Sequence, residues 1–393
     1  MPSKPSETPL LGNWNYPTAI RFGAGRIREL ADACRALGFK RPLLVTDPGL
    51  AKLSMISDAM IALRKEGIEV ALFSDVKPNP VAANVEAGIR VLRAGKHDGV
   101  IAWGGGSGID TAKAIAFMAG QTRPLWDFED VGDWWTRANP AAILQTIAVP
   151  TTAGTGSETG RASVITNAEQ HTKKVIFHPK MMPAIVIADP ELTVGLPPKL
   201  TAGTGMDAFI HCFEAYCAPG YHPYAEGIAV EGMRLVKNNL ARAVKDGRDI
   251  EARGHMLAAS QMGSTAFQKG LGAIHALSHP VGAVLDTHHG LTNAVAMPYV
   301  VTFNRAAIED KVVRLARWLD LRTPNFEGFM QWTLDFRREV GIPHTLAELG
   351  VKVEHLDRLS EMAAVDPTAG GNPVKAGVPE MRKMYEAAVA GRL

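Results

Sequence analysis

The first half of the chain alternates short, almost continuously apolar runs with segments of helical pattern. Five such runs are present: PLLVTD (42–47), EVALF (69–73), DGVIAW (98–103), AAILQTIAVP (141–150) and AIVIADP (184–190). A strand that is apolar on both faces must be covered on both faces, which is typical of parallel sheets flanked by helices. Between two runs, NVEAGIRVLRA (84–94) predicts a helix that packs through Val85, Ile89, Val91 and Leu92. We therefore predict a doubly wound α/β domain with a mostly parallel sheet.

Two of these runs lead into glycine-rich loops. GGGSGIDTAKAIA (104–116) sets three glycines and a serine before a helical pattern, and PTTAGTGSETG (150–160) follows the next run. Such a turn lets backbone N–H groups and the positive end of a helix dipole approach a phosphate. The first motif matches neither GxGxxG nor a P-loop, and a glycine turn without a ligand is the plainer interpretation. Two such loops at the carboxyl edge of one parallel sheet nevertheless favour a nucleotide site.

The second half concentrates side chains that bind metals. Asp207 and His211 are four residues apart, as are His275 and His279, and this spacing puts each pair on one face of a helix. Four of the twelve histidines fall within positions 275–289. A single histidine is more often a hydrogen-bonded core residue, but burying several without a shared cation is costly. One carboxylate with two or three imidazoles suits Fe, Zn, Ni or Co, so we predict a transition-metal site.

The length of 393 residues exceeds the usual size of one hydrophobic core. No strand pattern follows AIVIADP, and the glycine and prolines of residues 195–198 are typical of a loop. We therefore expect an α/β domain over 1–194 and an all-helical domain over 195–393. Forty-two basic and forty acidic side chains give a net charge of +2. This is not the large positive charge that is typical of proteins that bind nucleic acid or an anionic membrane. Small-molecule partners are favoured.

The compartment is predicted from cysteines and apolar segments. Three cysteines, an odd number, fit a reducing compartment better than a disulfide framework. The N-terminal segment 1–17 is polar, contains prolines and lacks the apolar core of a signal peptide, and no apolar run approaches the length of a membrane span. We expect a cytoplasmic protein.

These motifs, in this order, resemble the iron-containing, or group III, alcohol dehydrogenase family. The matching stretches cover nearly the whole chain: FGAG (22–25), LLVTD (43–47), GGGSGIDTAK (104–113), PTTAGTGSE (150–158), LTAGTGMDAFIH (200–211), the histidine-rich segment and NAVAMPYV (293–300). The resemblance implies an NAD-binding α/β domain, a helical metal domain and a cleft between them. It implies an oxidoreductase that transfers a hydride between a small primary alcohol and NAD. It also implies a homodimer or a higher homo-oligomer.

For the metal, the resemblance implies the ligands Asp207, His211, His275 and His289, holding Fe(II) first and Zn(II) as the alternative. Spacing alone favours His279 over His289. Segment 270–290 contains four glycines and a proline, so we expect His289 to arrive from a turn beyond the helix that carries His275. His279, discussed in relatives as a proton relay, is our catalytic candidate. A role in orienting a ligand is equally open.

For the cofactor, the resemblance implies contacts from both glycine-rich loops and from two further positions. The implied residues are Gly105, Gly106, Ser107 and Asp110 in the first loop, Thr151, Thr152 and Thr155 in the second, Lys173 near the ribose, and Asp47. Asp47 matches the position that faces the adenosine ribose. A carboxylate there accepts hydrogen bonds from both hydroxyls and repels a 2′-phosphate, so we expect NAD rather than NADP.

The chain departs from the family pattern at residues 159–162, TGRA, where many relatives have a Val-Thr type sequence. Arg161 in this stretch and Lys269, six residues before His275, are expected to reach the cleft from opposite domains. Cations in a partly dry cleft hold a carboxylate through charge-assisted hydrogen bonds, so the substrate is expected to be a hydroxy acid or a semialdehyde. Surface positions or cofactor contacts are the plainer interpretation of both residues.

Two alternative functions share these features. A polyol (glycerol-type) dehydrogenase or a dehydroquinate synthase-like enzyme has the same architecture, with a metal and NAD in other chemistry. A nucleotide- and metal-binding protein without turnover would also account for the loops and the histidines. Oxidation of primary alcohols with NAD, in the presence of Fe(II) or Zn(II), separates these alternatives from the alcohol dehydrogenase.

Overall fold

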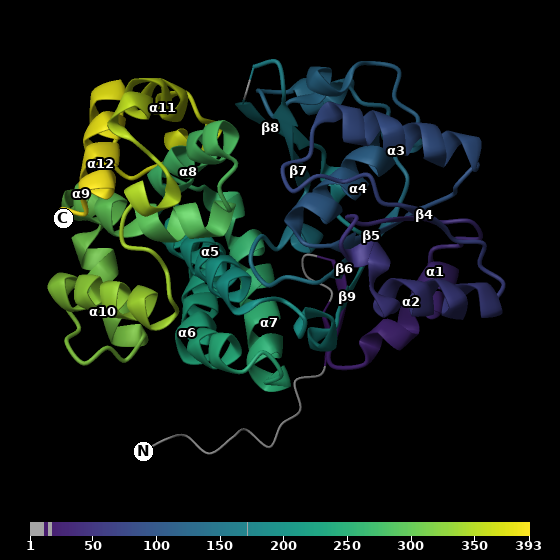
Figure 1. The fold of residues 1–393 in the computed structure, drawn as a ribbon, viewed down its shortest axis with the longest axis horizontal. Helices are drawn as coiled ribbons and strands as arrows, with labels where there is room; N and C mark the ends of the chain where they lie inside the picture. Colours follow the sequence, from purple (N-terminus) through teal and green to yellow (C-terminus); the bar gives the residue numbers. More distant parts are fainter. Residues whose placement is uncertain (1–11, 15–17, 171) are drawn as a thin grey trace.

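The computed structural model describes residues 12–14, 18–170 and 172–393, so most of the N-terminal segment used above to predict the compartment lies outside the described residues. Strands and helices alternate through the first half, and helices alone build the second (Figure 1). The change falls between β9 (Ile185–Ala188) and α5 (Pro198–Cys217). The predicted α/β and all-helical architecture is confirmed. The assignment of 1–194 and 195–393 as the two domains stays a prediction.

A seven-stranded sheet organises the first half, in the order β1-β2-β9-β6-β5-β3-β4. All neighbouring strands are parallel except β1, which pairs antiparallel with β2. Each of the five predicted apolar runs supplies one strand. Strands β1 and β2, at one edge of the sheet, were not predicted. Buried and half-buried residues alternate in β2, so this strand has no apolar run. The strands are β1 (Gly12–Trp14), β2 (Ala19–Phe22), β3 (Leu43–Val45), β4 (Ala71–Phe73), β5 (Val100–Gly104), β6 (Thr146–Pro150) and β9.

Alternate residues of the central strands face two separate cores. In β5, Val100 and Ala102 pack in the core under α3 and α4, whereas Ile101 and Trp103 pack in the core under α1 and α2. All four are fully buried. Because both faces of the strand are buried, its sequence is one continuous apolar run. Figure 1 shows these helices on the two sides of the sheet: α1 (Leu30–Ala36), α2 (Ser54–Lys65), α3 (Ala82–Ala94) and α4 (Gly106–Met118).

Helix α3 contains the predicted helix 84–94 and corrects its packed face. Val85 and Leu92 are buried and Ile89 packs against the same core, but Val91 is 37% exposed. At about 100° per residue, positions 85, 89 and 92 share one face and position 91 lies away from it. The expectation for Val91 was wrong because it ignored this period.

A separate hairpin, β7 (Ala162–Asn167) and β8 (Thr172–Phe177), lies outside the main sheet. It was not predicted, because β7 alternates buried and half-buried residues and β8 is mostly half-buried. Strand β7 packs against α4, while β8 packs against α8 (Ala273–Leu285) of the helical half. The hairpin therefore links the two halves of the molecule and carries Lys173 toward the second.

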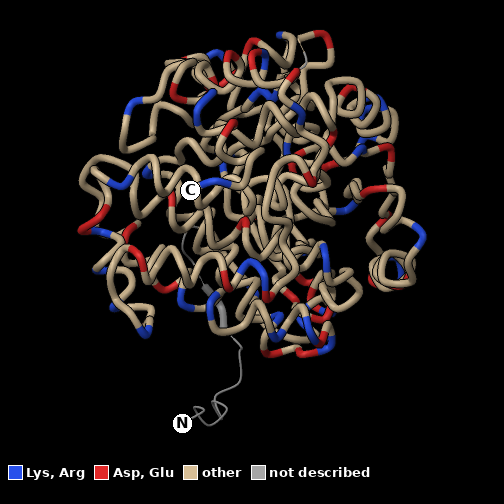
Figure 2. Tube along the Cα trace, turned by 60° about the vertical axis from the view of Figure 1, so that its left-hand side comes forward, with Lys and Arg blue, Asp and Glu red and all other residues tan. Residues whose placement is uncertain are grey.

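Eight α-helices enclose one large core in the second half. Helix α5 packs against α6, α7 and α9. Within the described residues, no helix is long and apolar enough to cross a membrane. Basic and acidic residues are interspersed along the trace (Figure 2), in keeping with the small net charge. The helices after α5 are α6 (Pro223–Lys245), α7 (Ile250–Ala266), α8 (Ala273–Leu285), α9 (His289–Trp318), α10 (Phe326–Glu339), α11 (Leu356–Ala364) and α12 (Val378–Ala390).

The approach of α9 to α5 depends on Gly290, the second residue of α9. A Cβ added there would lie 2.3 Å from the carbonyl oxygen of Gly203 and 3.1 Å from the Cβ of Asp207. The first obstacle is backbone, which cannot move aside by changing a rotamer. Any side chain at position 290 would therefore push the two helices apart.

We predict that Gly290→Ala lowers the free energy of unfolding by about 1–3 kcal/mol, the usual cost of overpacking. Gly227→Ala in α6 is the matched control, because no atom lies within 4 Å of a Cβ added there. Replacing a helical glycine by alanine without a clash should stabilise by about 0.5–1 kcal/mol. Urea denaturation of wild type and both variants tests this. A Gly290→Ala protein as stable as the Gly227→Ala protein would contradict the close approach.

Candidate metal centre and cofactor-binding edge

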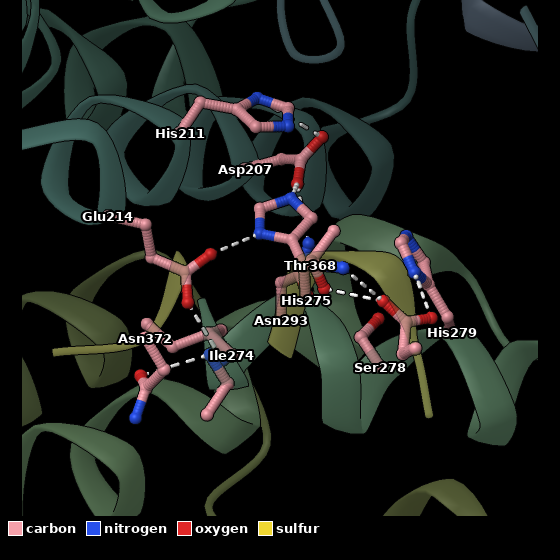
Figure 3. Close-up of polar contacts among 12 residues, drawn as sticks. Asp207, His211, Glu214, Ile274, His275, Ser278, His279, Asn293, Thr368 and Asn372 are labelled. Atoms are coloured by element: carbon pink, nitrogen blue, oxygen red, sulfur yellow. Dashed lines mark hydrogen bonds and ion pairs between the residues drawn. The ribbon is translucent and has the colours of Figure 1, made fainter. Parts of the chain in front are cut away.

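Asp207, His211, His275 and His289 come together from three helices. Asp207 and His211 lie one turn apart on α5, His275 is in the first turn of α8, and His289 is the first residue of α9. One ligand atom from each residue lies within 4.8 Å of the other three. The carboxylate of Asp207 is 4.0, 3.9 and 3.7 Å from nitrogens of the three imidazoles. Figure 3 shows Asp207 between His211 and His275.

Two unpaired nitrogens indicate what would complete the cluster. His211 Nδ1 and His275 Nε2 are buried, face Asp207, and have no hydrogen-bond partner within the described residues. An unsatisfied buried polar atom costs about 1–3 kcal/mol. A cation shared with Asp207 would satisfy both nitrogens. Burial lowers the pKa of His211 to about 4, so this imidazole is neutral, the form that coordinates a metal.

The other atoms of the cluster are held by neighbouring polar groups. His275 Nδ1 lies 2.5 Å from Glu214 Oε2, and Asn293 Nδ2 donates to Asp207 Oδ1 at 2.8 Å. Neither partner was predicted from the sequence. Glu214 continues the face of Asp207 and His211 at the i, i+4, i+7 spacing of a helix, so this period could have singled it out.

His279 lies beside the cluster. Its ring centroid is 5.3 Å from that of His289, and its Nδ1 is 2.9 Å from Asp366 Oδ2. Asp366 also accepts a hydrogen bond from the Thr368 hydroxyl at 2.6 Å. Spacing alone favoured His279 for the cluster, but the structure groups His289 there, because the turn between α8 and α9 brings the later histidine back. The expected turn beyond the helix of His275 is thus present.

The two glycine-rich loops meet at the carboxyl edge of β5 and β6. Thr151 N–H donates to the carbonyl of Gly104 at 3.0 Å. A Cβ on Gly106 would lie 2.6 Å from Thr155 Oγ1, and one on Gly105 would lie 3.1 Å from Thr152 Oγ1. The loops can touch only because these positions lack side chains. Gly105 also provides no side-chain cap for α4, so N–H groups of its first turn are free of side-chain partners, which fits a pyrophosphate.

Two expected cofactor residues have partners within the protein. The Ser107 hydroxyl donates to the carbonyl of Pro78, so only the backbone of Ser107 remains for a phosphate. Asp110 is 6% exposed, and its carboxylate accepts hydrogen bonds from the Ser157 hydroxyl and, at 3.0 Å, from Val164 N–H. Asp110 therefore ties α4 to the second loop and to β7. Both oxygens of Asp110 thus have partners within the protein, and the expected contact with the cofactor stays a prediction.

The second loop is fixed between α4 and α7 by buried charges. Lys113 Nζ donates to the carbonyl of Ser157 at 2.9 Å. Gln261 of α7 donates to Glu158 Oε1 at 3.3 Å, and burial raises the pKa of the Glu158 carboxyl to about 7. A Cβ on Gly156 would lie 2.4 Å from the Ser260 carbonyl oxygen. The loop that is expected to line the cofactor is thus anchored to a helix of the helical half.

Lys173 and Asp47 remain open to a ligand. Lys173 Nζ lies 3.5 Å from a Cβ position on Gly282 of α8, and burial lowers the pKa of its ammonium group. The backbone of Lys173 belongs to the β7–β8 hairpin, but its ammonium group has no hydrogen bond or ion pair with another described residue. Asp47 follows β3, and its Oδ1 accepts hydrogen bonds from Gly49 and Leu50 N–H at 2.8 and 3.0 Å. This turn holds the carboxylate at the edge of the sheet.

Arg161 lies at the junction of the two halves. Its guanidinium donates to Gln268 Oε1 at 2.7 Å and lies 5.5 Å from the ring centroid of Phe177. Gln268 belongs to the short helix η9 (Phe267–Lys269). The centroid of the neighbouring Phe267 ring is 5.1 Å from that of the His211 ring, so Arg161 contacts a segment that packs against the Asp/His cluster.

Lys269 contacts residues of the helical half. Its Nζ lies 2.7 Å from Glu226 Oε1 and 3.3 Å from the Tyr216 carbonyl oxygen, and its side chain is 2% exposed. Lys311 Nζ lies 2.9 Å from the same Glu226 oxygen, so Lys269 belongs to an ion-pair cluster of the helical half. The expected contact of Lys269 with a substrate carboxylate gains no support from this geometry and stays a prediction.

Comparison with known proteins agrees with this geometry. The model of the iron-containing alcohol dehydrogenases matches residues 17–190, and that of the C-terminal part of the Fe-containing alcohol dehydrogenase family matches 201–389. The 4-hydroxybutyrate dehydrogenase of Cupriavidus necator is 39% identical, over 94% of this chain and 98% of its own. The NAD-dependent methanol dehydrogenase of Bacillus methanolicus is 34% identical, over 96% and 100%.

Among solved structures, a 1,3-propanediol oxidoreductase superposes with a TM-score of 0.89 at 36% identity, over 94% of this chain and 97% of the other. The similarity therefore extends over both halves and includes the segments that carry the loops and the Asp/His cluster. This chain belongs to the iron-containing alcohol dehydrogenase family and is an NAD-dependent oxidoreductase that acts on alcohols.

Proposed function

We propose that this enzyme oxidises a small primary alcohol bearing a carboxylate, a hydroxy acid of the 4-hydroxybutyrate type, to its semialdehyde, and reduces the semialdehyde in the reverse direction. The position of Arg161 carries the proposal. Its guanidinium has five N–H donors, and the hydrogen bond to Gln268 engages one side of the group. The remaining donors suit bidentate binding of a carboxylate. The relative named a 4-hydroxybutyrate dehydrogenase supports the same class.

Asp207, His211, His275 and His289 are the proposed ligands of a divalent ion, Fe(II) first and Zn(II) as the alternative. Such an ion supplies Lewis acidity beside the substrate oxygen. The four residues bring a single negative charge from Asp207, so net positive charge remains to stabilise an alkoxide. His279 would take up the alcohol proton at Nε2, since Asp366 holds Nδ1 at 2.9 Å. NAD, when bound, would accept the hydride from the carbon that bears the hydroxyl.

Backbone N–H groups at Gly105 and Gly106 are proposed to hold the pyrophosphate of NAD, since the first turn of α4 has no side-chain cap. Lys173 is proposed to reach the ribose, and Asp47 the adenosine ribose. Thr151, Thr152 and Thr155 would line the cofactor from the second loop. The homodimer or higher homo-oligomer implied by the resemblance stays a prediction.

We expect His289→Ala protein to bind little Zn(II) or Fe(II) and to lose turnover, because it removes one of four donors. Its unfolding temperature without metal should stay near that of wild type, since the sheet has its own cores. His255→Ala, a half-buried helical histidine outside the cluster, is the matched control and should keep its metal. Elemental analysis and steady-state kinetics measure both. Full metal content and full activity in His289→Ala would rule out the ligand set.

We expect Asp47→Gly and Asp47→Asn to raise the kcat/KM of NADP relative to NAD by at least about fivefold, because both remove the charge that repels a 2′-phosphate. Asp47→Asn keeps an oxygen acceptor for the turn at Gly49 and Leu50, so it isolates the effect of charge. Kinetics with both cofactors provide the test. A wild-type enzyme that prefers NADP would show the assignment to be wrong.

We expect Arg161→Ala to lower kcat/KM for 4-hydroxybutyrate by about 10- to 100-fold and to leave 1,3-propanediol nearly unaffected, because one charge-assisted contact is lost. Arg305→Ala is the matched control: this guanidinium also stacks on a phenyl ring, 4.4 Å from the centroid of Phe326 in the helical half, and should affect neither substrate. Equal losses on both substrates, or a wild-type preference for neutral alcohols, would contradict an anionic substrate.

A further inference from the structure

Glu214 is a buried carboxylate with two different donors. It lies on α5, one turn after His211, and is 6% exposed. Oε2 is 2.5 Å from Nδ1 of His275, and Oε1 accepts the backbone N–H of Ile274 at 2.7 Å. Both contacts fall in the first turn of α8, and Figure 3 shows Glu214 on the side of the His275 ring opposite Asp207.

The hydrogen bond to Nδ1 determines which nitrogen of His275 is free. A neutral imidazole carries one proton, on either Nδ1 or Nε2. An ionised carboxylate only accepts hydrogen bonds, so it selects the form with the proton on Nδ1. The lone pair then lies on Nε2, which is unpaired and 3.9 Å from Asp207 Oδ1.

An amide could not replace this carboxylate, because it has one oxygen and one NH₂ group. With its oxygen on Ile274 N–H, its NH₂ would face Nδ1 of His275 and favour the form with the proton on Nε2. With its oxygen on Nδ1, its NH₂ would oppose Ile274 N–H, a contact between two donors. Only a side chain that accepts at both ends satisfies both groups.

We propose that Glu214 is a positioning residue that holds His275 in the Nδ1–H form, so that Nε2 is available to the metal. The inference rests on the proposed metal site and assigns a role to a residue outside the ligand set. Acidic partners of this kind fix the orientation of a metal-binding histidine and raise its basicity.

A purely structural role for Glu214 would be to stabilise the start of α8. Asn372 provides the comparison, because its Oδ1 accepts the N–H of Ala273 at 3.1 Å in the same helical turn without touching His275. Loss of either side chain removes one acceptor from the start of α8. Only loss of the carboxylate at position 214 changes the partner of the imidazole.

The test uses full-length wild type, Glu214→Gln and Asn372→Ala. Chelator competition gives the Zn(II) affinity of each protein, and ¹⁵N chemical shifts of labelled histidine, assigned through His275→Gln, give the protonated nitrogen of His275. We expect Glu214→Gln to bind Zn(II) about 10- to 100-fold more weakly and, without metal, to move the proton of His275 to Nε2. Asn372→Ala should be less stable to heat yet keep the wild-type Zn(II) affinity and the Nδ1–H form.

Three results would overturn the inference. If Glu214→Gln binds Zn(II) as tightly as wild type, or keeps the proton on Nδ1, Glu214 does not position His275, and the proposed ligands and reaction are unaffected. If Asn372→Ala weakens Zn(II) binding as much as Glu214→Gln does, stability of α8 explains both losses. If wild type itself binds no Zn(II) or Fe(II), the metal site fails and this inference fails with it.

Discussion

The contact of Gly290 with the backbone of Gly203 sets the distance between α5 and α9, and the rest of the site depends on it. A Cβ at position 290 would lie 2.3 Å from the Gly203 carbonyl oxygen. The short distance lets the first residue of α9, His289, reach the Asp207 carboxylate on α5, 3.7 Å away. Helix α8 adds His275 through its first turn, which Glu214 of α5 holds by two hydrogen bonds. Close helix packing thus brings four potential ligands together.

The cofactor-binding edge is coupled to this centre through the second glycine-rich loop. Gly154 and Gly156 pack closely against α5 and α7, since Cβ atoms there would lie 2.8 Å from the Thr204 carbonyl oxygen and 2.4 Å from that of Ser260. The same loop touches the N-terminus of α4 through Thr155. A change in the packing of the helical half would therefore move the loop that is proposed to line the cofactor, so the proposed cofactor and metal sites share one junction.

Much of the fold could be predicted because its cause is local in sequence. The central strands are buried on both faces, so the runs around β3, β4, β5, β6 and β9 were visible as apolar stretches. The hairpin β7–β8 was not predicted, because its half-buried strands carry polar residues and resemble a loop. Val91 was misassigned within a correctly predicted helix, where the period of the α-helix would have excluded it.

The candidate site could be predicted in part. Asp207 with His211, and His275 with His279, follow helical spacing, whereas the choice of His289 required the family resemblance, because a turn separates it from α8. Partners distant in sequence could not be foreseen: Lys269 forms an ion pair with Glu226, and the Asp110 carboxylate accepts hydrogen bonds from Ser157 and Val164. Composition and spacing show which polar side chains are present. They do not show which of these side chains already have a hydrogen-bond or ion-pair partner elsewhere in the chain.

We propose above all that Asp207, His211, His275 and His289 bind one divalent metal beside the cofactor-binding edge. Anomalous diffraction from crystals grown with Zn(II) or Fe(II), recorded on both sides of the metal absorption edge, tests it most directly. We expect one strong anomalous peak within about 2.0–2.2 Å of one atom from each of the four side chains. A peak bound by His279 in place of His289, or no peak among these residues, would contradict it.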